Sequence, residues 1–260
     1  MRIADPAWDA LGVTLPPGAT PPERVRGRRM LALLLGLALA LTGCTFSVST
    51  YGGQPPAPVP VPAPAPEGTD RQVSEQEADQ RAVDEESAVR EVDAYWRRHF
   101  TELTGRRYDS PQVAGGYSGR SGPSCAGQPS VPGNAFYCPS GDFLAWDENL
   151  MQAGYDRIGD SWVYLIIAHE WGHAIQARLR RGQVDVAAEL QADCLAGAAI
   201  FGAVNDGKLT LEAGDTREIQ QTLVLVSDDF PWTDESSHGN AQQRTAAFSA
   251  GANGGFDACV

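Results

Sequence analysis

Three long segments of the chain carry apolar residues in the pattern of α-helices. Residues 70–100 repeat large apolar side chains at helical spacing, which places them on one face. Residues 162–181 are apolar over their first half and become basic just before a glycine, as helices do where they end. Residues 186–205 are rich in alanine and are expected to end near Gly207. The apolar face of the first helix is formed by Val89, Val92, Trp96 and Phe100.

Shorter segments complete the predicted fold. Residues 105–145 are rich in Gly, Ser and Pro, and contain two short apolar stretches, 135–138 and 143–146, that are expected to be strands. Further helices are expected near 216–227 and 240–250. The pattern therefore predicts a mainly helical α+β domain built around the second and third long helices, and the sequence contains no internal repeat.

The N-terminal part of the chain has the features of a targeting segment. A basic cluster at 24–29 precedes an uncharged apolar run at 30–41. A dozen helical residues span about 18 Å, which is less than the ~30 Å of a bilayer core. A signal peptide is therefore expected rather than a membrane span. The run ends in Leu41-Thr42-Gly43-Cys44, which resembles the bacterial lipobox, so Cys44 is expected to carry a lipid; the alternative is an ordinary secretory signal with an incidental cysteine.

These features divide the chain into four predicted parts. Residues 1–23 form an N-terminal extension, and 24–44 form a lipoprotein signal peptide that ends at Cys44. Residues 45–69 alternate proline with other residues, which favours an extended, semi-rigid linker. Residues 70–260 form the folded domain.

The charge balance limits the partners of the chain. The formal net charge is −13. Residues 1–43 hold five arginines against three acidic residues, a net of +2, so the remainder carries −15. So acidic a chain is not expected to bind nucleic acid or anionic lipid through general electrostatics, and its acidity is expected to favour solubility.

Five cysteines are present, and four remain if Cys44 is acylated. An even number in an exported protein indicates disulfides, for which three pairings are possible. Cys125 with Cys138 would close a short loop rich in Gly, Pro and Ser, and Cys194 with Cys259 would join the C-terminal tail to the alanine-rich helix. We favour this pairing. A structural zinc site is the alternative, although no C-x-x-C spacing is present.

The second long helix contains His169-Glu170-Trp171-Gly172-His173. Residues four apart lie on one face of a helix, so His169 and His173 can hold a single metal ion. Glu170 projects nearby and can polarise a water on that ion. The alternative is a buried helix whose two histidines only make hydrogen bonds.

The alanine-rich helix offers a third ligand. Glu189 and Asp193 are four apart and share a face. Catalytic zinc commonly takes two histidines and a glutamate, and a further carboxylate accepts the outer N–H of a ligating histidine. We therefore expect Glu189 to bind the metal and Asp193 to orient a histidine. The reverse assignment, with Asp193 on the metal, and a pair of solvated carboxylates are the alternatives.

The segments AHEWGHAIQ (168–176) and ELQADCLAG (189–197) resemble the putative neutral zinc metallopeptidases of bacteria. The resemblance covers roughly residues 90–259 and extends to 136–139, Ser237-His238-Gly239 and Gln243-Arg244. The chain departs from the family in one place: family members tend to have an acidic residue shortly after the Cys-Pro, and this chain has Ser140-Gly141-Asp142. The resemblance implies a zincin-like domain, one zinc ion per chain and hydrolysis of peptide bonds.

The expected protein is therefore an exported, lipid-anchored zinc metallopeptidase on the extracytoplasmic face of the membrane, with a peptide or protein substrate. Glu170 is expected to be the general base, and His238 is our candidate for the oxyanion donor. A helix-capping or packing role is the alternative for His238, and Tyr137 and Tyr155 are further candidates for the donor. Two other functions stay open: a zinc amidase acting on a peptidoglycan amide, and a non-catalytic zinc-binding lipoprotein.

Overall fold

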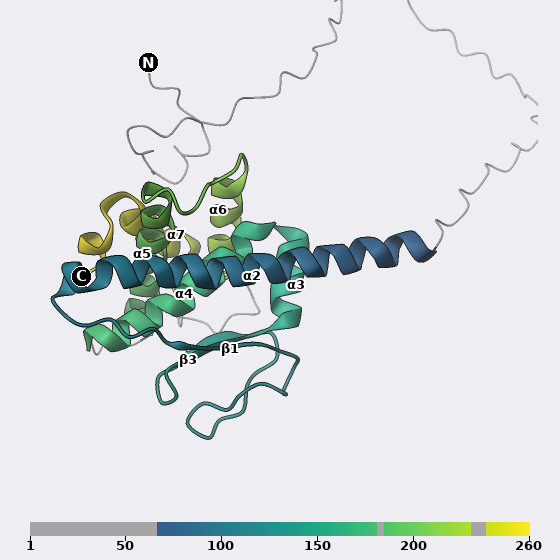
Figure 1. Cartoon of the computed structure of the whole chain (residues 1–260), viewed down its shortest axis with the longest axis horizontal. Coiled ribbons are helices and arrows are strands. Elements are labelled where there is room, and N and C mark those ends of the chain that lie inside the picture. Colours follow the sequence, from purple (N-terminus) through teal and green to yellow (C-terminus); the bar gives the residue numbers. More distant parts are fainter. Residues whose placement is uncertain (1–66, 181–184, 230–237) are drawn as a thin grey trace, which may run out of the picture.

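A computed structural model describes residues 67–180, 185–229 and 238–260 of the chain (Figure 1). The described residues contain six α-helices, a three-stranded mixed sheet and a short C-terminal 3-10 helix, which confirms the mainly helical α+β class. The predicted extension, signal peptide and most of the linker lie outside these ranges. The elements are α2 (Glu67–Thr104), β1 (Gln112–Tyr117), β2 (Ala135–Cys138), β3 (Phe143–Asp147), α3 (Glu148–Arg157), α4 (Asp160–Leu179), α5 (Asp185–Asn205), α6 (Asp215–Leu225), α7 (Ala241–Gly254) and η1 (Phe256–Cys259).

All predicted helices and both predicted strands are present, with ends that differ by a few residues. Helix α4 ends at Leu179, earlier than expected, because Arg180 takes the left-handed conformation that terminates it. Strand β1 and helix α3 were not predicted. Strand β1 contains two glycines, and α3 follows β3 without a loop, with the side chain of Asp147 accepting from the backbone N–H of Asn149 as its N-cap.

The helical core depends on close approach between helices. A Cβ atom on Gly172 of α4 would lie 2.7 Å from the carbonyl oxygen of Ala192 on α5, so only glycine permits this contact. Helices α5 and α7 meet in the same way, because a Cβ on Gly251 would lie 1.8 Å from the carbonyl oxygen of Cys194. The consequence is that the polar residues of α5 are held directly against those of α4 and α7.

Helix α2 runs across the other helices as a long rod (Figure 1). Its predicted apolar face is confirmed, since Val92, Trp96 and Phe100 are fully buried. Trp96 also packs edge-to-face on Phe256 of η1, with 6.2 Å between the ring centroids. One helix of the described residues, α5, is long and apolar enough to cross a membrane, but two thirds of that stretch is buried inside the domain, as expected of a core helix.

The sheet has the order β1-β3-β2, with β1 parallel and β2 antiparallel to the central β3. One edge of β2 pairs with no other strand among the described residues, and we call it the free edge of β2. Both predicted disulfides are present, Cys125–Cys138 and Cys194–Cys259, each with 5.5 Å between the Cα atoms. The first joins the preceding loop to β2, and the second joins η1 to α5.

A buried carboxyl group lies where α2 meets the sheet. Glu85 is 7% exposed, accepts the indole N–H of Trp146 at 3.1 Å and pairs with Arg81, which also pairs with Glu148. Burial, together with the nearby charge of Glu148, raises the pKa of Glu85 from 4.5 to about 7. A carboxyl group whose pKa is raised by folding binds its proton more tightly in the folded state, so it stabilises the fold at low pH and less as pH rises through this range.

We therefore expect Glu85→Gln to flatten the pH dependence of stability, because glutamine keeps an acceptor for Trp146 but does not titrate. Melting temperatures of both proteins between about pH 5 and pH 8 should diverge, with the wild type losing stability relative to the variant as pH rises. Glu86→Gln, on the exposed face of the same helix, is the control. A difference between wild type and Glu85→Gln that stays constant with pH would contradict this assignment.

Candidate metal centre

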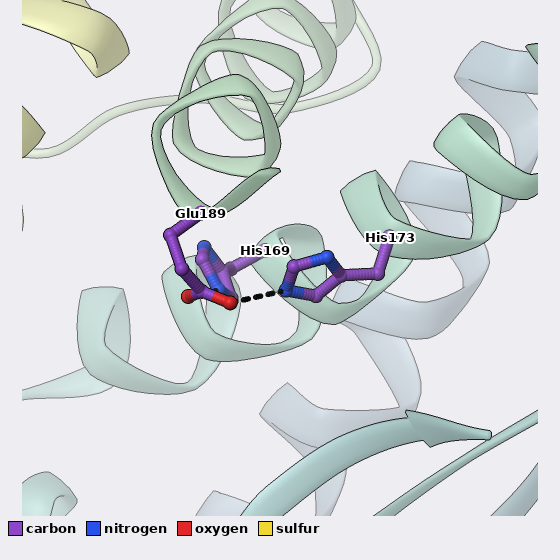
Figure 2. Close-up of side chains that lie close together, drawn as sticks. All are labelled: His169, His173 and Glu189. Atoms are coloured by element: carbon purple, nitrogen blue, oxygen red, sulfur yellow. Dashed lines mark hydrogen bonds and ion pairs between the residues drawn. The ribbon is translucent and has the colours of Figure 1, made fainter. Parts of the chain in front are cut away.

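Two histidines of α4 and one glutamate of α5 converge on a single point (Figure 2). One potential ligand atom from each of His169, His173 and Glu189 lies within 4.8 Å of the other two. The Nε2 atom of His169 is 3.2 Å from one carboxylate oxygen of Glu189, and that of His173 is 3.3 Å from the other. The three residues predicted as ligands are therefore brought together by the packing of α4 on α5.

The charges at this point suit a cation. Burial opposes ionisation of Glu189, but hydrogen bonds from the two histidines outweigh it and hold its pKa well below the usual range. Burial likewise opposes protonation of His169, yet the charge and hydrogen bond of Asp193 raise its pKa to about 10. Two imidazole nitrogens and one carboxylate form the donor set of a zinc site that leaves a position for water. The residues present thus fit a zinc ion.

Asp193 lies behind His169 and not in the group of three. Its side chain is fully buried, and Oδ1 accepts from Nδ1 of His169 at 2.8 Å. This contact orients the Nε2 atom of His169 towards Glu189 and His173. Glu189 thus belongs to the group of three candidate ligands, whereas Asp193 contacts one of them from behind.

Arg244 of α7, which the sequence analysis names as part of the family resemblance without assigning it a role, completes this contact. It donates from Nε to Oδ2 and from Nη2 to Oδ1 of Asp193, both at 2.8 Å, and its Nη1 donates to the carbonyl oxygen of Val226. A fully buried carboxylate is very costly unless it is paired, and this bidentate contact neutralises it. An arginine in a helix normally indicates a solvated face, so only the burial of Asp193 reveals its partner.

Glu170 faces a different neighbour. Its carboxylate accepts the backbone N–H of Tyr137 at 2.8 Å, across the free edge of β2. A cleft of about 1080 Å³ lies beside this contact, and its lining includes the three candidate ligands, Glu170 and His238. The predicted base is therefore held between the helix and the strand, inside the same cleft as the candidate ligands.

His238 lines this cleft and is half-buried, with Nδ1 3.5 Å from Oδ1 of Asp228. The N-cap of α7 is Asn240, whose side chain forms a reciprocal capping box with Gln243. Asn240 rather than His238 is therefore the N-cap of α7. The other two candidate donors are engaged elsewhere, since the hydroxyl of Tyr137 donates to Asp142 and that of Tyr155 donates to Asp84.

The unusual turn after Cys-Pro has a structural role. Asp142 accepts two hydrogen bonds from Nη2 of Arg178, each at 3.0 Å, and one from the hydroxyl of Tyr137 at 2.7 Å. These contacts fasten the β2–β3 turn to the last turn of α4. The position of β2 against Glu170 thus depends on the carboxylate of Asp142, which lies in the turn where this chain departs from the family pattern.

A buried helix pair that carries two histidines and a glutamate around one point defines a candidate metal centre of the type used by zinc-dependent hydrolases. The chain matches the family described as "Putative neutral zinc metallopeptidase" over residues 24–259, and it belongs to this family. No curated protein and no solved structure matches the chain.

The contact between Arg244 and Asp193 leads to a prediction for metal affinity. Arg244→Lys keeps the charge but loses the bidentate contact, so Asp193 should orient His169 less firmly. We expect the affinity for zinc to fall about 10- to 100-fold, measured by competition with a chromophoric chelator. Arg178→Lys, which alters the far end of α4, is the control and should bind zinc normally. Equal affinities in the two variants would show that Arg244 does not position the ligands.

Proposed function

We propose that this protein is a zinc peptidase in which His169, His173 and Glu189 hold one ion and Glu170 is the general base. Zinc, when bound, acts as a Lewis acid on the attacking water and on the substrate carbonyl. Glu170 takes the proton of that water and passes it to the leaving nitrogen. The observation that carries the proposal is the position of Glu170, whose carboxylate lines the same cleft as the three candidate ligands.

The free edge of β2 supports a peptide as substrate. The N–H of Tyr137 points away from β3 towards Glu170, and because strands repeat every two residues, the N–H of Ala135 has the same orientation. An extended peptide could add to this edge through main-chain hydrogen bonds, which bind a backbone of any sequence. The strand would then align a peptide bond along the cleft.

Export and lipid anchoring belong to the same proposal. The lipobox-like sequence before Cys44 supports attachment to a membrane. The two disulfides support an oxidising compartment, since such bonds are rare in the cytosol. The proline-rich residues 45–69 would separate the domain from the membrane surface.

Two substitutions separate the base from the ligands. Glu170→Gln should fold normally, because the amide oxygen can still accept the N–H of Tyr137, and it should bind one zinc ion while losing nearly all hydrolysis. Glu189→Ala should lose zinc because it removes a ligand. Elemental analysis and cleavage of a mixed peptide library measure the two effects. A Glu170→Gln variant with most of the wild-type rate would exclude Glu170 as the base.

His238 is our proposed oxyanion donor. If its imidazole donates to the developing negative charge, His238→Ala should lower kcat by about 10²–10³ while zinc content and melting temperature stay nearly unchanged. His99→Ala, which removes a histidine paired with Asp206 on another face, is the control. Unchanged turnover of the folded, zinc-loaded His238→Ala protein would assign His238 to packing instead.

A further inference from the structure

One face of α4 contributes eight residues to the cleft, and its chemistry changes at His169. The residues of α4 in the cleft recur at helical spacing and so form one stripe. From Trp162 to Ile166 the stripe is apolar, and from His169 onward it contains two histidines, a glutamate, a glutamine and an alanine. The stripe consists of Trp162, Leu165, Ile166, His169, Glu170, His173, Gln176 and Ala177.

The walls beside the apolar part are apolar apart from Arg157 of α3, which also lines the cleft. They come from α3 and from the end of α6, and we call this part of the cleft the apolar compartment. Gly154 allows α3 to lie directly against Trp162, since a Cβ there would lie 2.0 Å from the indole ring. The compartment is formed by Leu150, Ala153, Gly154, Trp162, Leu165, Ile166, Leu225 and Val226.

The compartment adjoins the candidate metal centre. Ile166 precedes Glu170 by one turn of helix, about 6 Å along the axis, and Trp162 by about 12 Å. Successive residues of an extended peptide are separated by about 3.3 Å. A peptide bond held at Glu170 with its chain running along α4 would place the adjoining side chain near Ile166, and a large one would extend towards Trp162. A cationic group placed there would lose its hydration without gaining a partner, since the charged residue of the adjoining wall is Arg157.

We propose that the apolar compartment binds a large apolar side chain, such as leucine, phenylalanine or methionine, of the residue beside the scissile bond. This inference rests on the proposed peptidase function. The substrates would therefore have accessible large apolar residues at their cleavage sites. Folded proteins usually bury such residues in their cores. Extended or unfolded peptide segments are accordingly the substrate class.

Ala153 and Ala177 provide a matched pair of substitutions. Both are exposed alanines on helices, and they line opposite ends of the cleft. Zinc-loaded, full-length wild type should cleave a mixed peptide library with leucine, phenylalanine or methionine favoured about tenfold or more over alanine beside the scissile bond. Ala153→Trp fills the compartment and should shift the preference to small residues, whereas Ala177→Trp should keep the wild-type preference.

A second measurement does not depend on hydrolysis. Acetohydroxamate and a phenylalkyl hydroxamate share one zinc-binding group, and only the second carries an apolar arm. The arm should tighten binding to the wild type and to Ala177→Trp by about tenfold or more, and should give no gain in Ala153→Trp, as followed by titration calorimetry.

The outcomes separate the two proposals. If no peptide is cleaved, the peptidase function is wrong, and the hydroxamates still decide whether the compartment binds an apolar group. If peptides are cleaved without an apolar preference beside the scissile bond, the function stands and the compartment has no such role. Equal affinities of the wild type for the two hydroxamates, or an unchanged preference in Ala153→Trp, would also overturn the inference.

Discussion

The buried carboxylate of Asp193 is the point on which the rest of the structure depends. It has no access to solvent, and it contacts His169 of α4 and Arg244 of α7 from its own place on α5. Such a charge is tolerated in a protein interior only when its partners are held in good geometry. The glycine contacts that bring α4 and α7 against α5 are therefore as necessary for the metal centre as for the core, and the disulfide of the adjacent Cys194 fixes the C-terminal end of the domain to the same helix.

The small sheet has a different part in the site. The helices place the candidate ligands, whereas β2 places a backbone N–H against Glu170. The contact of Asp142 with Arg178 and Tyr137 holds that strand on α4, so the carboxylate of Glu170 and the free strand edge form one wall of the cleft. Glu170 is thereby held in the cleft that the candidate ligands also line.

Local signals explain which parts of this arrangement the sequence predicts. The long helices carry many apolar residues at a fixed period, and the spacings within His169–His173 and Glu189–Asp193 are properties of a helix alone. The contacts of Arg244, Asp142 and Glu170 join residues far apart in the chain, so no local pattern encodes them. Strand β1 was missed for the same reason. Its two glycines give it little strand propensity of its own, and it is held in the sheet by pairing with β3, about 30 residues further along the chain. Helix α3 differs, because the sequence does contain a local signal for it: Asp147 is a favourable N-cap residue directly before the helix.

The apolar run before the metal-binding motif shows how one pattern can have two causes. Helix α4 is apolar around most of its circumference, which by itself indicates only burial. Val163, Ile167 and Trp171 face the core, whereas Leu165 and Ile166 also border the cleft. Substitutions that enlarge or shrink the first set change the packing of α4 on its neighbours and hence stability. Substitutions in the second set change the shape of a surface that a ligand can reach. A helix that was fully amphipathic could position the metal ligands equally well, but it would leave the cleft beside them without an apolar floor.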